Sequence, residues 1–316
     1  MPARRISFVN FKGGVGKTSI IVNVAACLAY DLGQKVLLVD CDAQSNASIW
    51  LMGIERWNVI NSMPGKSVYG MFIPNLPPIT NNIIPSVVRN ERGMHLIPNL
   101  DLLPATYELM DLEEEYRDGQ GEPFFYRFHE HLRSTFNHYD YVLFDCPPNL
   151  FRASKCAIFA SEEIYVPCNP DKLSEIGLSL LVSKIDRFHK QTVLQQQQIP
   201  TFRPAKIRGV ILNDVDGRAQ LEGMQRYLRL TIAKARQHHV VSEDADILGQ
   251  QVRKAILAAK VVGSFLPVNL SNGSSGLKDD YLNLARFIHN TPLYKEVEHG
   301  TDRKTEQPRR TAKRAS

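Results

Sequence analysis

The chain has 316 residues and a net charge of +5, and 43% of its residues are hydrophobic. This content supports a buried core, and 22% charged residues is close to the globular average, so wholesale disorder is excluded. No apolar run approaches the ~18 residues of a membrane-spanning helix, and Met1–Asn10 lacks the apolar core of a signal peptide. The five cysteines are widely spaced, which supports neither a disulfide framework nor a thiolate metal site. We therefore expect a cytoplasmic protein.

The charge is unevenly distributed along the chain. His299–Ser316 has six Lys or Arg residues and two acidic residues. Ser183–Arg236 has eleven basic and four acidic residues, whereas Glu108–Glu130 has eight acidic residues and two Arg residues. Clusters of one sign are typical either of a solvated face or of a surface for a charged partner. The motifs must decide between these two interpretations.

Short apolar runs, typical of strands buried on both faces of a parallel sheet, alternate with apolar residues at helical spacing. This alternation indicates βαβ units with right-handed crossovers. We therefore predict an α/β fold with a mainly parallel, twisted sheet and helices on both faces. The expected strands are Ile6–Asn10, Val36–Val39, Tyr141–Phe144, Ile164–Val166, Val210–Leu212 and Val261–Leu266. The expected helices are Ser19–Leu32, Leu173–Phe188, Ala219–Arg236 and Leu277–Ile288.

The sequence predicts one domain followed by a basic tail. We place the domain at residues 1–298, with insertions around 53–90 and 189–206, and the tail at 299–316. The run Gln195–Gln198 is typical of an exposed loop. The tail has too few apolar residues to form a core, so we expect it to be disordered.

A glycine-rich turn joins the first expected strand to the first expected helix. Its glycines allow successive backbone N–H groups to converge on one anion, and the helix N-terminus adds partial positive charge. Lys17 supplies a cation for the β- and γ-phosphates of a nucleotide, and the Thr18 hydroxyl reaches Mg²⁺. The strict G-x-x-x-x-G-K-[ST] pattern is not met, because Phe11 occupies its first position and Lys12 its second. The residues expected at the phosphates are Lys12, Gly13, Gly14, Val15, Gly16, Lys17, Thr18 and Ser19.

Carboxylates follow two of the expected strands. Val36–Val39 is followed by Asp40-Cys41-Asp42, and Tyr141–Phe144 is followed by Asp145. Ligands of open α/β sheets bind beyond the carboxyl ends of the strands, so these three carboxylates should face the nucleotide. Asp145 has the setting of a Walker-B acid, which holds Mg²⁺ through water.

These motifs together resemble the ParA/MinD family of deviant Walker-A ATPases. The resemblance rests on Lys12–Thr18, Val36–Asn46 and Tyr141–Pro148, and it extends over roughly residues 4–290. It implies a P-loop fold and an Mg²⁺-dependent ATPase whose cofactors are ATP and Mg²⁺. The sequence departs from the family pattern at Phe11, Ala43 and Ser45, where Gln, Pro and Gly respectively are usual.

The resemblance also implies roles for individual residues. In a homodimer with the nucleotides sandwiched between the protomers, Lys12 of one protomer would contact the phosphates bound to the other and stabilise their negative charge. Asp42 would position the attacking water, which makes Lys12, Lys17 and Asp42 the catalytic candidates. Asp40 would support the Mg²⁺ shell together with Thr18 and Asp145. Asn213 and the backbone near Leu266 and Pro267 would contact adenine.

The resemblance implies a DNA-linked positioning ATPase of the ParA kind, cytoplasmic and associated with the nucleoid. The ATP dimer would bind double-stranded DNA non-specifically through Lys and Arg, and hydrolysis stimulated by a ParB-like or cargo-adaptor protein would release it. Because the phosphate site begins at residue 12, we expect no N-terminal helix-turn-helix ahead of it. The DNA-binding candidates are Lys184, Arg187, Lys190, Arg203, Lys206, Arg208, Arg218, Arg226 and Arg229.

Two alternative functions would use the same ATPase activity. The first is an ATPase that positions a protein cargo on the nucleoid, which gene neighbourhood would separate from DNA partition. The second is a MinD-like ATPase on a membrane surface, which needs a C-terminal amphipathic helix. Thr301–Ser316 contains no Leu, Ile, Val, Phe, Trp or Met, so we expect no membrane partner. An iron–sulfur carrier on the same fold would need paired cysteines, which the spacing does not provide.

Overall fold

The computed structural model describes residues 2–114, 123–199, 202–215, 221–254, 266–271 and 275–293. Its centre is a seven-stranded sheet in the order β3-β2-β4-β1-β5-β6-β7, and every neighbouring pair is parallel. The predicted parallel α/β sheet is therefore confirmed. The strands are β1 (Arg4–Phe8), β2 (Val36–Asp40), β3 (Leu100–Leu103), β4 (Tyr141–Asp145), β5 (Glu163–Cys168), β6 (Lys206–Leu212) and β7 (Val241–Ile247).

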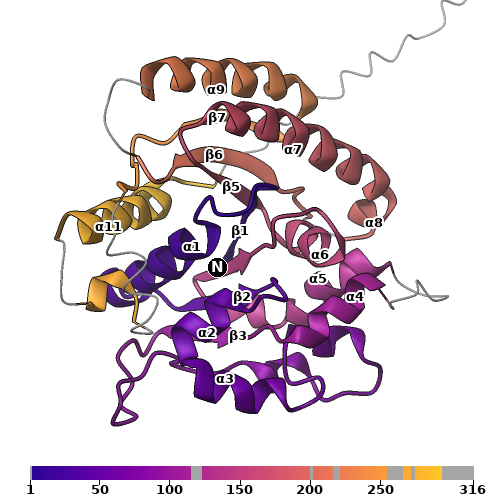
Figure 1. Cartoon of the computed structure of the whole chain (residues 1–316). Helices are drawn as coiled ribbons and strands as arrows, with labels where there is room; N and C mark the ends of the chain where they lie inside the picture. The colour runs from indigo at the N-terminus through magenta and orange to yellow at the C-terminus, as the bar shows by residue number, and fades with distance from the viewer. Residues whose placement is uncertain are drawn as a thin grey trace, which may run out of the picture.

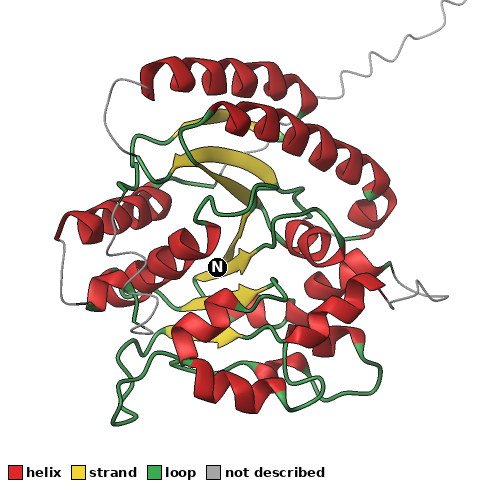
Figure 2. Ribbon diagram, in the orientation of Figure 1, coloured by secondary structure: helices red, strands yellow, loops and turns green. Residues whose placement is uncertain are grey.

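Helices cover both faces of the sheet, as Figures 1 and 2 show. One face carries α1 (Lys17–Ala26), α2 (Asn46–Met52), α3 (Ile54–Asn61) and α11 (Ser275–Asn290). The other carries α4 (Asp111–Glu114), α5 (Arg127–Leu132), α6 (Arg152–Ala160), α7 (Lys172–Gln191) and α9 (Leu221–Ala235), with α8 (Val193–Gln198) following α7. A π-helical turn, Cys27–Asp31, extends α1. Short 3₁₀ helices lie at Val68–Phe72, Ile79–Asn82, Tyr107–Met110, Phe124–Tyr126, Thr135–Asn137, Arg236–His238 and Val268–Leu270.

The central strands are buried on both faces, which is why they read as continuous apolar runs. All five residues of β2 and all five of β4 are buried. Alternate side chains enter different cores: Val39 and Phe144 pack under α5, α6 and α7, whereas Leu38 and Leu143 pack under α1 and α2. This double burial holds the carboxyl ends of β1, β2 and β4 at one rigid edge.

The two strands that the sequence reading missed are the edge strands β3 and β7. β7 has the sequence VSEDADI, and charged residues are a usual feature of edge strands, where they discourage pairing with another chain.

The strand predicted at Val261–Leu266 falls mostly outside the described residues, and Leu266 itself is not in a strand. The loop predicted at Gln195–Gln198 is wrong, because these residues form the last turn of α8.

The insertion around 53–90 packs beside β3. The Ile84 N–H donates to Leu102 O at 2.8 Å, and the Val87 N–H donates to Leu100 O at 2.9 Å. The indole N–H of Trp57 reaches Ala105 O at 3.0 Å. These contacts join the insertion to the sheet, whereas the predicted tail at 299–316 lies outside the described residues.

A buried ion cluster fastens the end of α11 to the amino ends of the strands. Glu163 is fully buried, and its carboxylate contacts Arg4 at 2.6 Å and Arg208 at 3.1 Å. Arg4 donates to the carbonyls of Ile288 and Thr291, and Arg208 donates to that of Pro292. Arg208 is also paired with Asp244 and is only 4% exposed. Its expected role as a DNA-binding residue is therefore wrong, because a phosphate cannot reach this buried side chain.

Replacing Arg208 with Ala should destabilise the fold by about 3–5 kcal/mol, because it leaves the buried Glu163 carboxylate with one cation fewer. Urea unfolding followed by circular dichroism measures this change. The matched control is Arg187→Ala on the exposed face of α7, which should change stability by less than about 0.5 kcal/mol. Equal effects of the two substitutions would contradict the structural role of Arg208.

Candidate nucleotide site

The loop between β1 and α1 has the backbone that a phosphate site requires. Gly14 and Gly16 have positive φ angles of 72° and 80°, a region that favours glycine. A Cβ on Gly16 would also lie 2.2 Å from Asn213 Nδ2. Asn213 donates to Val15 O at 3.1 Å, so the end of β6 supports this loop. Glycine at position 16 is thus required by both its conformation and its close neighbour.

Lys17 begins α1 and is directed into the edge of the sheet. It is 7% exposed, and its Nζ donates to Lys12 O at 3.2 Å. Burial lowers the pKa of Lys17, while the nearby Asp145, Cys146 and Asp42 act in the opposite direction. The result is a desolvated cation beside the loop, which is suited to binding phosphate.

Asp40 and Asp145 lie opposite each other at the ends of β2 and β4. Asp40 is fully buried, and its Oδ2 accepts hydrogen bonds from the Ser48 hydroxyl at 2.7 Å and the Ser48 N–H at 2.9 Å. Burial raises the pKa of Asp40 to about 7, against the hydrogen bonds from Ser48. Burial, followed by the charge of Asp40, also raises the pKa of Asp145. Two adjacent buried carboxyl groups cannot both ionise easily without a nearby cation.

The residues present fit a magnesium ion. Asp145 is 1% exposed, and neither of its oxygens has a hydrogen bond of good geometry among the described residues. Thr18 and Lys17 lie close enough to favour its charged form. No group of three or more His, Cys, Asp or Glu side chains in the described residues could hold a metal alone. Mg²⁺ is commonly held by one or two carboxylates together with substrate phosphates, which matches this donor set.

Asp42 lies in the turn that follows β2. Its Oδ1 accepts a hydrogen bond from the Gln44 N–H at 3.0 Å, and its carbonyl accepts one from the Ser45 N–H at 2.8 Å. Ser45, which precedes α2, has a φ of 55° and is buried. This left-handed conformation explains why the family usually has Gly here, and a serine costs roughly 1 kcal/mol.

Lys12 points away from the buried carboxylates and forms an ion pair with Asp171. Its side chain is 34% exposed. Asp171 precedes α7, and its Oδ1 accepts the Ser174 N–H at 3.0 Å, as an N-cap does. Burial acts to raise the pKa of Asp171, but the hydrogen bond and charge of Lys12 outweigh it and lower the pKa. Sequence reasoning missed Asp171, although an Asp before a helical run is an N-cap signal.

The two residues expected at adenine lie in different places. Asn213 contacts the phosphate loop, whereas the segment after Pro267 is tied to α1 through a hydrogen bond from the Val268 N–H to Asn23 Oδ1 at 2.7 Å. No hydrogen bond among the described residues joins Pro267 to Asn213.

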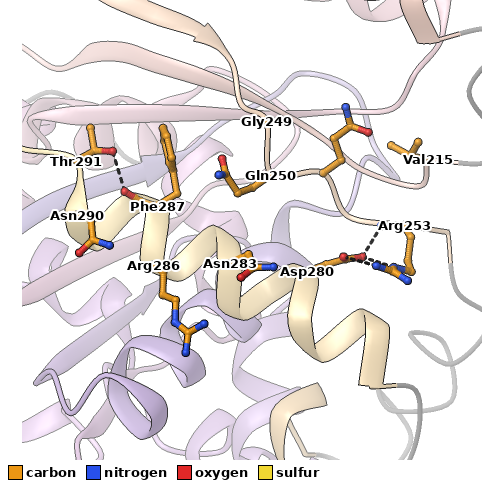
Figure 3. A pocket seen from close by; sticks show the side chains of 11 residues that line it. Val215, Gly249, Gln250, Arg253, Asp280, Asn283, Arg286, Phe287, Asn290 and Thr291 are labelled. Carbon is orange, nitrogen blue, oxygen red and sulfur yellow. Dashed lines mark hydrogen bonds and ion pairs between the residues drawn. The ribbon is translucent and has the colours of Figure 1, made fainter.

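A cavity of about 800 Å³ is lined by Val215, by the loop around Gly249 and Arg253, and by α11. Figure 3 shows it between the Gly249–Arg253 loop and α11, with the Arg253–Asp280 ion pair at one side. Neither of the two expected adenine residues, Asn213 and Pro267, is among the described residues that line this cavity.

Five of the nine expected DNA-binding residues lie on the helices α7 and α9. Lys184, Arg187 and Lys190 are exposed on α7, and Arg226 and Arg229 are exposed on α9. Lys190 is paired with Asp186 at 2.7 Å and Arg229 with Asp246 at 3.3 Å. Arg203 is exposed and Lys206 is half-buried, whereas Arg218 lies outside the described residues.

Comparison with known proteins identifies the family. Residues 3–199 match a family described as an AAA domain. The sporulation initiation inhibitor protein Soj of Bacillus subtilis is 33% identical over 72% of this chain and 81% of its own length. The chromosome partitioning protein ParA of Caulobacter vibrioides is 31% identical over 70% and 73% of the two chains. The chain belongs to the ParA/MinD family of P-loop ATPases.

Solved structures share the fold. Cobyrinic acid a,c-diamide synthase from Mycobacterium smegmatis, with bound ADP and magnesium, is 22% identical, covers 91% of this chain and 94% of its own, and has a TM-score of 0.61. A putative plasmid partition protein from Borrelia burgdorferi, bound to AMPPNP, is 19% identical over 92% and 100% of the two chains, with a TM-score of 0.62. These ligands agree with the expected ATP and Mg²⁺. Among the described residues, no helix has the length and apolar character needed to cross a membrane.

In the nucleotide-free, metal-free protein, the stabilisation that Asp40 contributes should increase as the pH falls from about 8 to about 5. Burial lowers the pKa of His129 and His189 to about 4, and these two side chains act in the opposite direction below about pH 6.5. The contribution of Asp40 is therefore measured against a variant that lacks its carboxyl group. The folded pKa of Asp40 is about 7, above the unfolded value of about 3.9, so the folded state binds this proton more tightly. The stabilisation is complete below the unfolded pKa and is lost as the pH rises through about 7. Its slope cannot exceed ~1.4 kcal/mol per pH unit for one proton.

Urea unfolding in EDTA at several pH values measures this dependence in the native chain and in two variants. The native chain should gain stability relative to Asp40→Asn as the pH falls, whereas the difference between the native chain and Asp279→Asn, which changes an exposed carboxyl group on α11, should not depend on pH. A stability difference between the native chain and Asp40→Asn that grew in favour of the native chain from pH 6 to pH 8 would show that Asp40 is not the buried acid described.

Proposed function

We propose that this chain is an Mg²⁺-dependent ATPase that positions DNA by forming an ATP-sandwich dimer. The dimer binds duplex DNA non-specifically and is released when a partner protein stimulates hydrolysis. The observation that carries the proposal is the arrangement of Lys17, Asp40 and Asp145 around the phosphate loop, with Lys12 directed outward from the same edge. The similarity to chromosome partitioning proteins supports DNA as the cargo.

Each residue of the site has a distinct task in this proposal. Lys17 and the backbone of the loop bind and orient the phosphates. Asp145 and Thr18 would hold Mg²⁺, whose charge would offset that of the phosphates. Asp42, which is less buried than Asp40, positions a water molecule for attack. Asn213, which donates a hydrogen bond to Val15 of the loop, contacts the adenine base in this proposal.

Exposed apolar side chains around this edge support a face-to-face partner. Phe151, which follows β4, is 59% exposed, and Leu173 and Ile176 at the start of α7 are 64% and 68% exposed. All three lie beyond the carboxyl ends of strands that flank β1. Leu173 and Ile176 are three residues apart and so share one face of α7, and exposed apolar surface of this kind is typical of an interaction site. A second copy bound here would receive Lys12 at its phosphates and exclude water from both sites.

The alternative of a protein cargo on the nucleoid uses the same enzyme and the same dimer. The partner that stimulates hydrolysis would then be a cargo adaptor rather than a ParB-like protein. Proteins recovered with the ATP-bound chain from its own cells separate the two, because a ParB-like partner would itself bind DNA.

Sedimentation of the Asp42→Ala variant with Mg²⁺ and ATP should show a dimer, because the variant binds the nucleotide but cannot position the attacking water. Lys17→Ala should abolish ATP binding, since the phosphates lose their buried cation. Lys12→Ala should retain ATP binding as a monomer. A monomeric Asp42→Ala protein at saturating ATP would contradict the sandwich mechanism.

The Asp171→Asn variant should dimerise at a lower ATP concentration than the native chain. Asparagine keeps the N-cap of α7 but removes the charge that holds Lys12 within its own protomer. A partly exposed ion pair contributes about 0.2–1 kcal/mol, so the ATP midpoint for dimerisation should fall by up to about fivefold. The control is Asp186→Asn, which removes an ion pair far along α7 and should leave the midpoint unchanged. An unchanged midpoint in Asp171→Asn would show that this ion pair does not compete with the dimer.

A further inference from the structure

A cavity of about 510 Å³ lies between the insertion around 53–90 and α5. This volume is within the roughly 300–1,000 Å³ of pockets that hold small organic ligands. Among the described residues, none from the phosphate loop and neither of the two buried carboxyl groups lines it, so it is separate from the nucleotide site. One wall is the segment Gly70–Thr80, and the other consists of Arg127, Glu130, His131 and Ser134.

The segment Gly70–Thr80 forms a wall of fixed shape. The side-chain amide of Asn82 donates to Gly65 O at 2.7 Å and to Ser67 O at 3.1 Å, which closes the segment into a loop. Leu76 packs so closely on Gly65 that a Cβ there would lie 2.5 Å from Leu76 Cδ1. Three prolines within the segment further restrict its backbone. The wall is therefore formed before a ligand binds, which reduces the entropy lost on binding.

This loop gives the cavity an apolar side. Phe72 and Ile79 are 8% and 4% exposed, and the Phe72 ring lies 6.0 Å from the ring of Phe128 in the core. Leu76 differs from both, because it lines the cavity and remains 40% exposed. Covering such apolar surface is favourable in water. The loop side of the cavity therefore favours a ligand with an apolar body.

The α5 side of the cavity carries a cation with unused hydrogen-bonding capacity. Arg127 Nε is buried and has no hydrogen-bond partner among the described residues. Glu130 Oε2 is 3.7 Å from Arg127 Nη1, which is an ion pair but too long for a hydrogen bond. The same oxygen lies 4.0 Å from His131 Nε2. A buried donor without a partner is costly, so Arg127 gains from a ligand that accepts its hydrogen bonds.

We propose that this cavity binds a small amphipathic carboxylate. The carboxylate of the ligand pairs with the guanidinium of Arg127, and its apolar body covers Leu76. A carboxylate matches a guanidinium in a two-point hydrogen-bonded pair. The Glu130 side chain is 42% exposed and can turn toward solvent when the ligand takes its place. An amine would be attracted to Glu130 but repelled by Arg127, and it would leave Arg127 Nε without an acceptor.

Calorimetric titration of the nucleotide-free, full-length chain with octanoate, octanol and octylamine tests the assignment. Octanoate should bind one molecule per chain. The two other probes should bind at least about tenfold more weakly, because neither head group accepts charged hydrogen bonds from Arg127. Octanol binding as tightly as octanoate would show an apolar hollow that does not recognise the head group, and equally tight octylamine would assign the site to Glu130. Either result, or no octanoate binding at about 10 mM, would overturn the proposal.

Substitutions on α5 locate the head group of the probe. Arg127→Gln should weaken octanoate binding at least about tenfold. Glu130→Gln should strengthen it by up to about fivefold, because no carboxylate of the protein then competes for the guanidinium. A gain in affinity cannot come from misfolding, so this variant tests the site even if Arg127→Gln loosens α5. Weaker binding in Glu130→Gln would overturn the proposal.

Two control variants exclude other cations as the binding group. Arg133→Gln changes an exposed cation one residue beyond α5 that is not part of the cavity lining, and it should leave octanoate binding unchanged. Lys17→Ala removes the cation of the phosphate loop and should also bind octanoate with native affinity. A loss in Lys17→Ala would place the probe in the nucleotide site, and a loss in Arg133→Gln as large as that in Arg127→Gln would indicate non-specific charge attraction. Both outcomes would overturn the assignment, whereas the proposed ATPase function does not depend on either.

Discussion

The site depends on two carboxyl groups buried side by side at the ends of β2 and β4. Asp40 and Asp145 cannot both be charged without a cation nearby, and Lys17 alone is itself desolvated by burial. Binding of a magnesium nucleotide would relieve this electrostatic cost, because it brings the metal to the carboxylates and the phosphates to the lysine. The burial of these carboxyl groups therefore both destabilises the nucleotide-free site and favours binding of a magnesium nucleotide.

The sheet is what makes this arrangement rigid. β2 and β4 have no solvated face, so their backbones are fixed from both sides by apolar packing. The hydrogen bonds from Ser48 to Asp40 and from Asn213 to Val15 then connect two further elements, α2 and the end of β6, to the same edge. The phosphate loop, α2 and the end of β6 are therefore held together at one edge of the sheet.

The central strands and the phosphate loop could be predicted from sequence because local patterns determine them. Apolar runs followed by Asp, and glycines before Lys17, need no tertiary information. Features that depend on distant partners could not be read in this way. A charged residue such as Arg208 is expected at the surface, yet its ion pairs with Glu163 and Asp244 hold it in the interior. Likewise, the partner of Lys12 is Asp171, 159 residues away, and four consecutive glutamines lie in α8 rather than in a loop.

The parallel topology separates two kinds of charge recognition within one protomer. All strands point the same way, so glycine-rich loops and carboxylates accumulate at their carboxyl ends, and the returning helices deliver their last turns to the amino ends. Cations in the last turn of a helix are also favoured by the helix dipole, which accounts for Lys190 at the end of α7 and Lys234 at the end of α9. A fold that gathers phosphate-binding groups at one edge for a nucleotide thus collects the cations of its returning helices at the opposite edge.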